Sequence, residues 1–189
     1  LDGTLVKIDD AAAKKVPGVV KIVSYKGTGA PMHVRAGVAV VATNTWAAIK
    51  ARKLLNITWN EGKKNKESTD QLFKTFAEKA KAKPQIEVFK KGDLSTVNGI
   101  MEVTADYSEP FLAHATMEPM NFVASVIGDD CEIWGGLQLP DWAVNTIAST
   151  CEIKKDRIKC NLTMMGGAFG RRLHFDFAIE AVKIAQQLN

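Results

Sequence analysis

Two hydrophobic patterns run through this chain and follow each other without a regular order. Short apolar or β-branched runs bounded by Gly, Pro, Asn or Asp predict strands. The expected strands are 19–25, 37–42, 57–59, 86–90, 97–107, 121–126, 131–134 and 157–164. Apolar spacings of three and four predict helices at 46–55, 68–81 and 141–150, and a last helix that follows Arg172 and runs to Leu188. This mixture, without a βαβ period, predicts an α+β fold with two sheets.

Capping signals sharpen the helix boundaries. Asn44 or Thr45 can cap the first helix, and Pro140 stands at the start of the third. Ser68, with Gln71 three residues later, resembles a capping box. These residue types fix where three of the four helices should begin.

Composition is that of a globular protein. The 189 residues are 46% hydrophobic and 24% charged, which fits one domain or two small ones. No apolar run reaches 18 residues, so no membrane span is expected. The opening Leu1-Asp2-Gly3-Thr4 has neither an initiator Met nor the features of a signal sequence. We therefore expect a piece of a longer protein, and its compartment stays open.

Charge is divided unevenly along the chain. Residues 1–97 hold 18 Lys/Arg and 9 Asp/Glu, a net +9, and residues 98–189 hold 7 and 12, a net −5. The basic half has few aromatic or arginine side chains that could stack on bases or read them. A solvated lysine surface is expected there, with no nucleic-acid partner. Docking of the basic half on an acidic neighbour remains the alternative.

The cysteines do not predict a metal site. Cys131, Cys151 and Cys160 lack the Cys-x-x-Cys spacing of zinc and iron–sulfur sites. Buried free thiols are expected, because free Cys is among the most buried residue types. A disulfide between Cys151 and Cys160 stays open.

A glycine-rich loop, 166–172, stands between the predicted strand 157–164 and the last helix. Its backbone N–H groups, the helix N-terminus and Arg171 and Arg172 could bind an anion such as a phosphate. The loop is neither a Walker loop nor a Rossmann fingerprint. A tight turn that lets strand and helix pack is the equal alternative. Gln138 lies in another loop, and its amide could donate to a ligand oxygen.

A second polar cluster lies upstream. His114, Glu118 and Asn121 fall within eight residues, too few ligands for a metal site. We expect a buried polar cluster that holds its own loop. Asp176, in the last helix, should face solvent or pair with an arginine.

Several of these segments resemble one known family. The segment 166–172 is similar to the Gly-Gly-Gly-Phe-Gly-Arg-Arg loop of the molybdenum hydroxylases, the xanthine dehydrogenase and aldehyde oxidase superfamily. The segment 114–121 and the Arg-Arg ending are most similar to the isoquinoline 1-oxidoreductase beta subunits and related aldehyde dehydrogenases. Trp134 to Pro140 is similar to the family's Trp-x-Gly-Thr-Gln-x-Pro. The segments 38–42 and 44–48, through Trp59, resemble the end of its α/β hammerhead domain.

The resemblance implies a fold and an activity. Residues 1–97 would be a partial α/β hammerhead domain with a helical extension, and 98–189 the N-terminal part of the molybdopterin-binding domain. The implied reaction hydroxylates an N-heterocycle or oxidises an aldehyde, with oxygen from water. The implied bacterial cofactor is molybdopterin cytosine dinucleotide, whose pterin dithiolene holds the metal without a protein ligand. Electrons would leave through a small iron–sulfur subunit.

The resemblance also implies site residues. In the family the glycine loop approaches the molybdenum centre, and Phe169 and Gly170 match the residues nearest the metal. Gln138 matches a glutamine that hydrogen-bonds a metal oxo group. The implied cofactor-binding residues are Gly166, Gly167, Ala168, Phe169, Gly170 and Arg171, and the implied catalytic residue is Gln138.

Four departures limit these implications. Ala168 replaces the third glycine, which is a mild change only if its φ is negative. Leu137 replaces a threonine, and Leu173 stands where purine-oxidising members have a glutamate. The family's catalytic glutamate would lie beyond Asn189. We therefore expect the 189 residues alone to be inactive and without bound cofactor. The alternative is a non-catalytic binding or assembly module that keeps the fold.

Overall fold

The computed structural model describes residues 3–29, 32–63, 66–96, 98–99, 101 and 103–188. They group into two compact units, one formed by 1–63 with 114–189 and the other by 64–113. The larger unit contains every strand of the described residues. Within the described part of the chain, no helix is long and apolar enough to cross a membrane.

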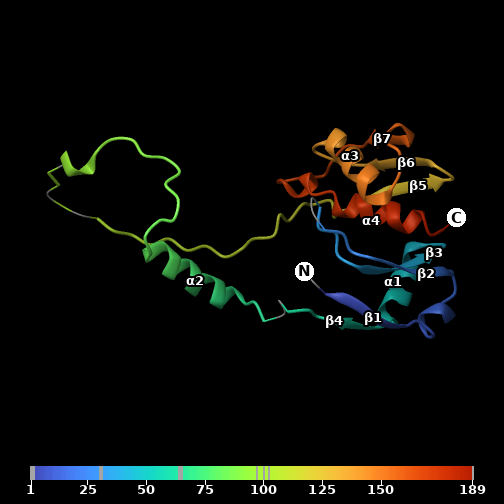
Figure 1. Ribbon diagram of the computed structural model, residues 1–189. Coiled ribbons are helices and arrows are strands. Elements are labelled where there is room, and N and C mark those ends of the chain that lie inside the picture. The colour runs from blue at the N-terminus through green and yellow to red at the C-terminus, as the bar shows by residue number, and fades with distance from the viewer. Residues whose placement is uncertain are drawn as a thin grey trace. The chain divides into compact units, whose positions relative to one another are not determined.

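Two small antiparallel sheets are built from the N-terminal segment (Figure 1). β1 (Thr4–Asp9) pairs with β4 (Asn56–Asn60), and β2 (Val19–Tyr25) pairs with β3 (Gly37–Ala42). Between β3 and β4 lies α1 (Thr45–Lys53), which buries Ala47 and Ala51. The Asn44 side chain caps α1 by accepting a hydrogen bond from the Ala47 N–H at 2.9 Å.

A three-stranded sheet follows in the C-terminal part of the same unit. Its order is β5 (Val123–Ile127), β6 (Asp130–Gly135) and β7 (Ile158–Leu162). β5 and β6 form a hairpin, whereas β6 and β7 are parallel and are connected through α3 (Pro140–Cys151). Parallel neighbours require such a crossover, because a tight turn can join only antiparallel strands.

The main core lies between this sheet, α3 and α4 (Asp176–Ala185). Fully buried members come from all three layers: Ile133 of β6, Ile147 of α3, and Ile179 and Val182 of α4. The predicted apolar stripe of the last helix is thus the face that packs inward. Met32 and Val34 extend the core toward the N-terminal sheets.

The smaller unit is built around α2 (Thr69–Lys81). Ser68 caps this helix, its hydroxyl accepting from the Gln71 N–H at 3.3 Å, which confirms half of the expected capping box. The Phe73 ring contacts those of Phe76 and Phe111, with centroids 6.3 and 6.2 Å away. The helix has no buried residue, and none of the described residues of this unit is buried, so the described part of the unit has no comparable core.

The α+β class is confirmed, and three of the expectations on its parts are wrong. The described residues form three sheets rather than two. The described residues of 86–90 and 97–107 contain no strand, while 97, 100 and 102 lie outside the described residues. Side chains there are exposed, Val88 by 91%, because no neighbouring strand pairs with them. The last helix begins at Asp176, since Arg171–Leu173 forms a separate 3₁₀ turn.

Candidate functional site

Two of the predicted site segments begin side by side at one edge of the sheet. β6 and β7 run parallel with Gly135 opposite Leu162, so their carboxyl ends coincide. The loop carrying Gln138 leaves β6 there, and the glycine loop leaves β7. The Thr163 N–H donates to the Gly135 carbonyl at 3.3 Å, which holds the two departing chains together.

Glu118 brings a third loop to the same place. Its N–H donates to the Gly166 carbonyl at 3.0 Å, and its Oε2 accepts from the Gly166 N–H at 2.6 Å. Its Oε1 accepts from the Asn121 amide at 2.8 Å. These bonds from Asn121 and Gly166, with the charge of Arg172, lower the pKa of Glu118 below its ordinary value. Glu118 and Asn121 hold the loop as expected, but the cluster is not the buried one predicted: Glu118 is half-buried, Asn121 is exposed, and His114 is exposed outside the cluster.

Arg172 lies at the centre of these loops and is completely buried. Its Nη2 pairs with Glu118 Oε2 at 2.9 Å, and its Nε donates to the Gly167 carbonyl at 2.9 Å. A longer bond of 3.4 Å joins its Nη1 to the Gly136 carbonyl. One guanidinium group therefore contacts all three loops.

Arg171 is committed to a different carboxylate. Its guanidinium makes a bidentate pair with Asp176, both bonds being 2.8 Å, and lies 5.7 Å from the Phe177 ring centroid. Burial opposes ionisation of Asp176, but the hydrogen bonds and charge of Arg171 outweigh it, and the pKa is lowered. The expected pairing of Asp176 with an arginine is confirmed.

These pairs change the interpretation of the loop as an anion site. Arg171 and Arg172 are each neutralised by a carboxylate of the chain. The N–H groups of Arg171 and Leu173 donate within the chain, to Ala168 and Gly170. The expected contribution of a helix N-terminus directly after the loop is wrong, because α4 starts only at Asp176. What the loop offers a ligand is therefore neutral backbone.

The tip of the glycine loop is unusual in backbone conformation. Gly167, Phe169 and Gly170 all have positive φ, at 102°, 49° and 85°. Ala168 has no positive φ, so its methyl group causes no strain. Phe169 adopts the left-handed conformation and is 73% exposed. Among the described residues, the N–H groups of Phe169 and Gly170 have no acceptor, so they are available to a ligand.

Gln138 lies against the same loop. Its N–H donates to the Arg172 carbonyl at 3.3 Å. Its side-chain Oε1 is buried and has no hydrogen-bond partner in the described part of the chain. Buried polar atoms nearly always have partners, so this amide lacks one that a bound group could supply.

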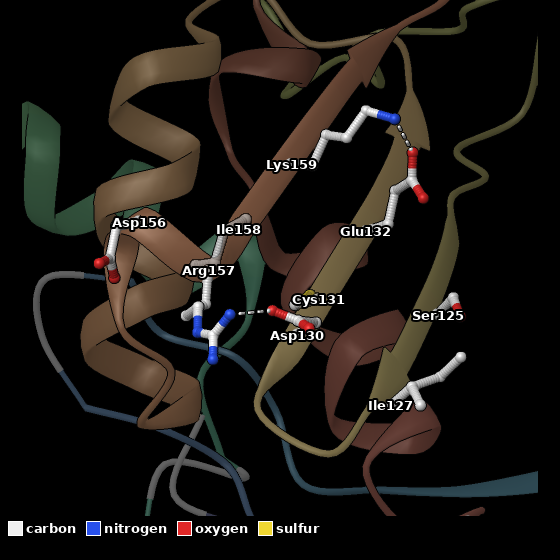
Figure 2. A pocket seen from close by; sticks show the side chains of 9 residues that line it. All are labelled: Ser125, Ile127, Asp130, Cys131, Glu132, Asp156, Arg157, Ile158 and Lys159. Atoms are coloured by element: carbon white, nitrogen blue, oxygen red, sulfur yellow. Dashed lines mark ion pairs between the residues drawn. The ribbon is translucent and has the colours of Figure 1, made fainter.

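Two hollows lie elsewhere, and none of the predicted site residues lines either. A groove of about 340 Å³ runs along β5–β7, where Lys159 pairs with Glu132 at 2.6 Å and Arg157 with Asp130 at 3.1 Å (Figure 2). A larger cavity of about 1070 Å³ lies between the N-terminal sheets. Both ion pairs in the groove are solvent-exposed and weak, so this surface offers little fixed charge.

The cysteines are free, as expected. Cys131 and Cys151 are buried, and burial raises the pKa of each thiol to about 11. Cys160 is half-buried. The described residues contain no group of three or more His, Cys, Asp or Glu that could hold a metal ion. A thiol with a raised pKa is a poor nucleophile, so these residues serve packing.

Comparison with known proteins finds a family match over the part of the chain that contains the three loops. The profile of the molybdopterin cofactor-binding domain matches residues 77–188. Isoquinoline 1-oxidoreductase subunit beta of Brevundimonas diminuta is 28% identical, over 96% of this chain and 24% of its own length. The aldehyde oxidoreductase molybdenum-binding subunit PaoC of Escherichia coli O157:H7 is 23% identical, over 90% and 25%. The chain thus spans about a quarter of these relatives.

The fold is shared with a solved enzyme. Quinoline 2-oxidoreductase from Pseudomonas putida 86 superposes with a TM-score of 0.66 at 17% identity, over 98% of this chain and 28% of that one. The profile match covers more than half of the 189 residues and includes all three loops of the site. The chain belongs to the molybdopterin cofactor-binding domain family.

Proposed function

We propose that this chain is part of the molybdenum-binding subunit of an oxidoreductase. The reaction would hydroxylate an N-heterocycle or oxidise an aldehyde, with water as the oxygen source. One observation carries the proposal. Among the described residues, the N–H groups of Phe169 and Gly170 and the buried amide oxygen of Gln138 have no hydrogen-bond partner, and Arg172 connects the two loops that contain them. The backbone N–H groups are neutral donors suited to a metal oxo group, and the Gln138 amide could donate to such a group after a rotation that exchanges its oxygen and nitrogen.

The site residues fit such a cofactor. A Cβ built on Gly170 would meet nothing within 4 Å, so the loop is open there, and the Gln138 amide has an unfilled position. A molybdenum cofactor, which we propose to be the molybdopterin cytosine dinucleotide form, would supply two-electron redox chemistry. The residues proposed to hold it are Gly166, Gly167, Ala168, Phe169, Gly170 and Arg171.

Each residue would contribute through position rather than charge. The N–H groups of Phe169 and Gly170 can stabilise negative charge without titrating. The Gln138 amide can present its oxygen or, after rotation, its N–H group to a ligand. The Phe169 ring, exposed here, would shield the reacting centre from water. Arg171 would act by fixing the loop through Asp176, since its charge is already paired.

The rest of the enzyme is proposed from the family. Residues 1–97 would be a partial α/β hammerhead domain, and 98–189 the N-terminal part of the molybdopterin-binding domain. A small iron–sulfur subunit would accept electrons, and the substrate would be a small N-heterocycle or aldehyde. The 189 residues alone should be inactive, because the family's catalytic glutamate motif is not among them.

Elemental mass spectrometry of the full-length protein from its native host tests this function. We expect molybdenum near one equivalent per chain, with a cytosine nucleotide released from the pterin on acid treatment. A folded protein free of molybdenum and pterin would overturn the enzyme proposal.

A non-catalytic assembly module is the second candidate. The internal pairing of both Arg171 and Arg172 favours it, because no free cation of the loop is left for an anionic cofactor. It predicts a metal-free protein that still forms a stable complex with a partner subunit. Size-exclusion chromatography of the native complex, followed by metal analysis of its peak, separates the two.

A further inference from the structure

We propose that Arg172 and Glu118 are positioning residues. Their ion pair would hold the three loops so that Gln138 and the N–H groups of Phe169 and Gly170 face one ligand. This inference rests on the proposed function for the identity of that ligand. The loop arrangement itself can be tested without it.

The donors of Arg172 are distributed over the loops rather than directed to solvent. Its Nε holds the Gly167 carbonyl, its Nη1 the Gly136 carbonyl, and its Nη2 both the carbonyl and the carboxylate of Glu118. A planar guanidinium with five fixed N–H groups can make such divergent bonds, and an ammonium group cannot. The side chain therefore sets the spacing of three backbone segments at once.

Glu118 completes the arrangement from the other side. Its Oε2 accepts from both Arg172 Nη2 and the Gly166 N–H, at 2.9 and 2.6 Å. A Cβ on Gly166 would lie 2.6 Å from the Glu118 Cβ, so the two chains touch at backbone distance. Gly166 is thus a glycine because Glu118 approaches it closely.

The same unit reaches Gln138. Arg172 accepts the Gln138 N–H through its own carbonyl while its side chain holds the carbonyl of Gly136. The segment 136–138 is therefore fixed at both ends by one residue. A small shift of Arg172 would move the Gln138 amide and the Phe169 backbone relative to each other.

Burial excludes a direct anion-binding role for Arg172. The side chain is 0% exposed, and its charge is compensated by Glu118 at 2.9 Å. A phosphate could reach it only by displacing Glu118 and opening the loops. The adjacent Arg171 belongs to a separate pair with Asp176, so the two arginines have different tasks.

The test compares Arg172→Met and Glu118→Gln with wild type in the full-length protein. Arg157→Met is the matched control, because Arg157 also pairs with a carboxylate but lies on the exposed groove of Figure 2. Molybdenum content and released pterin measure how much cofactor each variant retains. Hydrogen exchange of a peptide spanning 136–138, in cofactor-depleted protein, measures the loop directly. Arg172→Met should lower retention about 10- to 100-fold and speed this exchange, while Arg157→Met matches wild type.

Arg172→Lys keeps the test decisive if the methionine variant does not fold. A lysine keeps the positive charge beside Glu118, but its single ammonium group cannot at the same time donate to the carbonyls of Gly136 and Gly167. We expect a folded protein with faster exchange at 136–138 and an altered Mo(V) electron paramagnetic resonance spectrum. Unchanged exchange, molybdenum content and spectrum would overturn the proposal. Unfolding of the Lys and Gln variants alike would also overturn it, by assigning the pair to global stability.

The outcomes separate this inference from the proposed function. If the wild-type protein contains no molybdenum, the proposed cofactor is ruled out. Faster hydrogen exchange at 136–138 in the variants would still support the loop-positioning role. A molybdenum-containing wild type whose variants keep both the metal and slow exchange would support the function and reject the positioning pair.

Discussion

Glu118 and Gly166, 48 residues apart, are joined by two opposed hydrogen bonds: each N–H donates to an oxygen of the other residue. This contact leaves no room for a side chain at Gly166, since an added Cβ would lie 2.6 Å from the Glu118 Cβ. Gly166→Ala should therefore cost about 1–3 kcal/mol of the free energy of unfolding. Urea denaturation of the full-length protein measures it.

Gly29→Ala is the control for that substitution. A Cβ there meets nothing within 4 Å, and φ is not positive. Its effect should stay within about 0.5 kcal/mol. Equal effects at both positions would show that the close approach of Glu118 to Gly166 does not limit stability.

Gln138→Met separates binding from folding. The buried Oε1 of Gln138 has no partner among the described residues, so its removal should leave stability unchanged or raise it by about 1 kcal/mol. Retention of molybdenum should fall, because the amide is lost. Gln186→Met is the control: this amide donates to the Cys151 carbonyl at 2.9 Å, and its loss should cost about 1 kcal/mol without affecting the metal. A strongly destabilised Gln138→Met would mean that the amide serves packing.

Asp176 should contribute to stability above acidic pH. Its pKa is lowered in the folded state, so its contribution is present above the unfolded pKa and is lost as pH falls through the folded pKa. Asp176→Asn should flatten the acid side of a plot of unfolding free energy against pH. The exposed hairpin residue Asp129 provides the comparison, and Asp129→Asn should keep the wild-type slope. Parallel curves for wild type and Asp176→Asn would contradict the assignment.

Tyr25 should make the free energy of unfolding fall as pH rises in the alkaline range, which is opposite in sign to the effect of Asp176. Burial, and then the charge and hydrogen bond of Glu180, raise its pKa from 10.0 to about 12. A raised folded pKa means that stability falls as pH rises from 10.0 toward about 12. Tyr25→Phe should remove much of this slope in denaturation curves. Tyr107→Phe, at a tyrosine that is 93% exposed, should not.

The sequence correctly predicted the elements whose ends are set by residues close to them in the chain. Strands 19–25 and 37–42 match β2 and β3, and the caps at Asn44 and Ser68 are where the sequence placed them. Such signals act over a few residues and need no distant partner. The segments 86–90 and 97–107 have the same strand-forming composition, but their described residues have no paired neighbour. β-propensity describes fit to a sheet surface, so it cannot show whether that surface is present.

The sequence could locate two loops of the candidate site but not the contacts that join them. The glycine loop and Gln138 could be singled out from the sequence, and the structure places both at one sheet edge. Which of two adjacent arginines is buried depends on the 3₁₀ turn at Arg171–Leu173, which no sequence pattern marks. The partner of Arg172 is 54 residues away, beyond the reach of any local pattern.

The Arg172 guanidinium contacts all three loops, and this has a consequence for synthesis on the ribosome. Glu118 and Gly136 emerge well before Arg172, so their loops cannot adopt the final spacing until that residue has left the exit tunnel. Closing such long segments costs entropy before any bond compensates it. Under the proposed function, a nascent chain that has reached α3 but not residue 172 would lack the arranged loops that we propose to hold the cofactor. The cofactor would then bind only after all three loops have assembled.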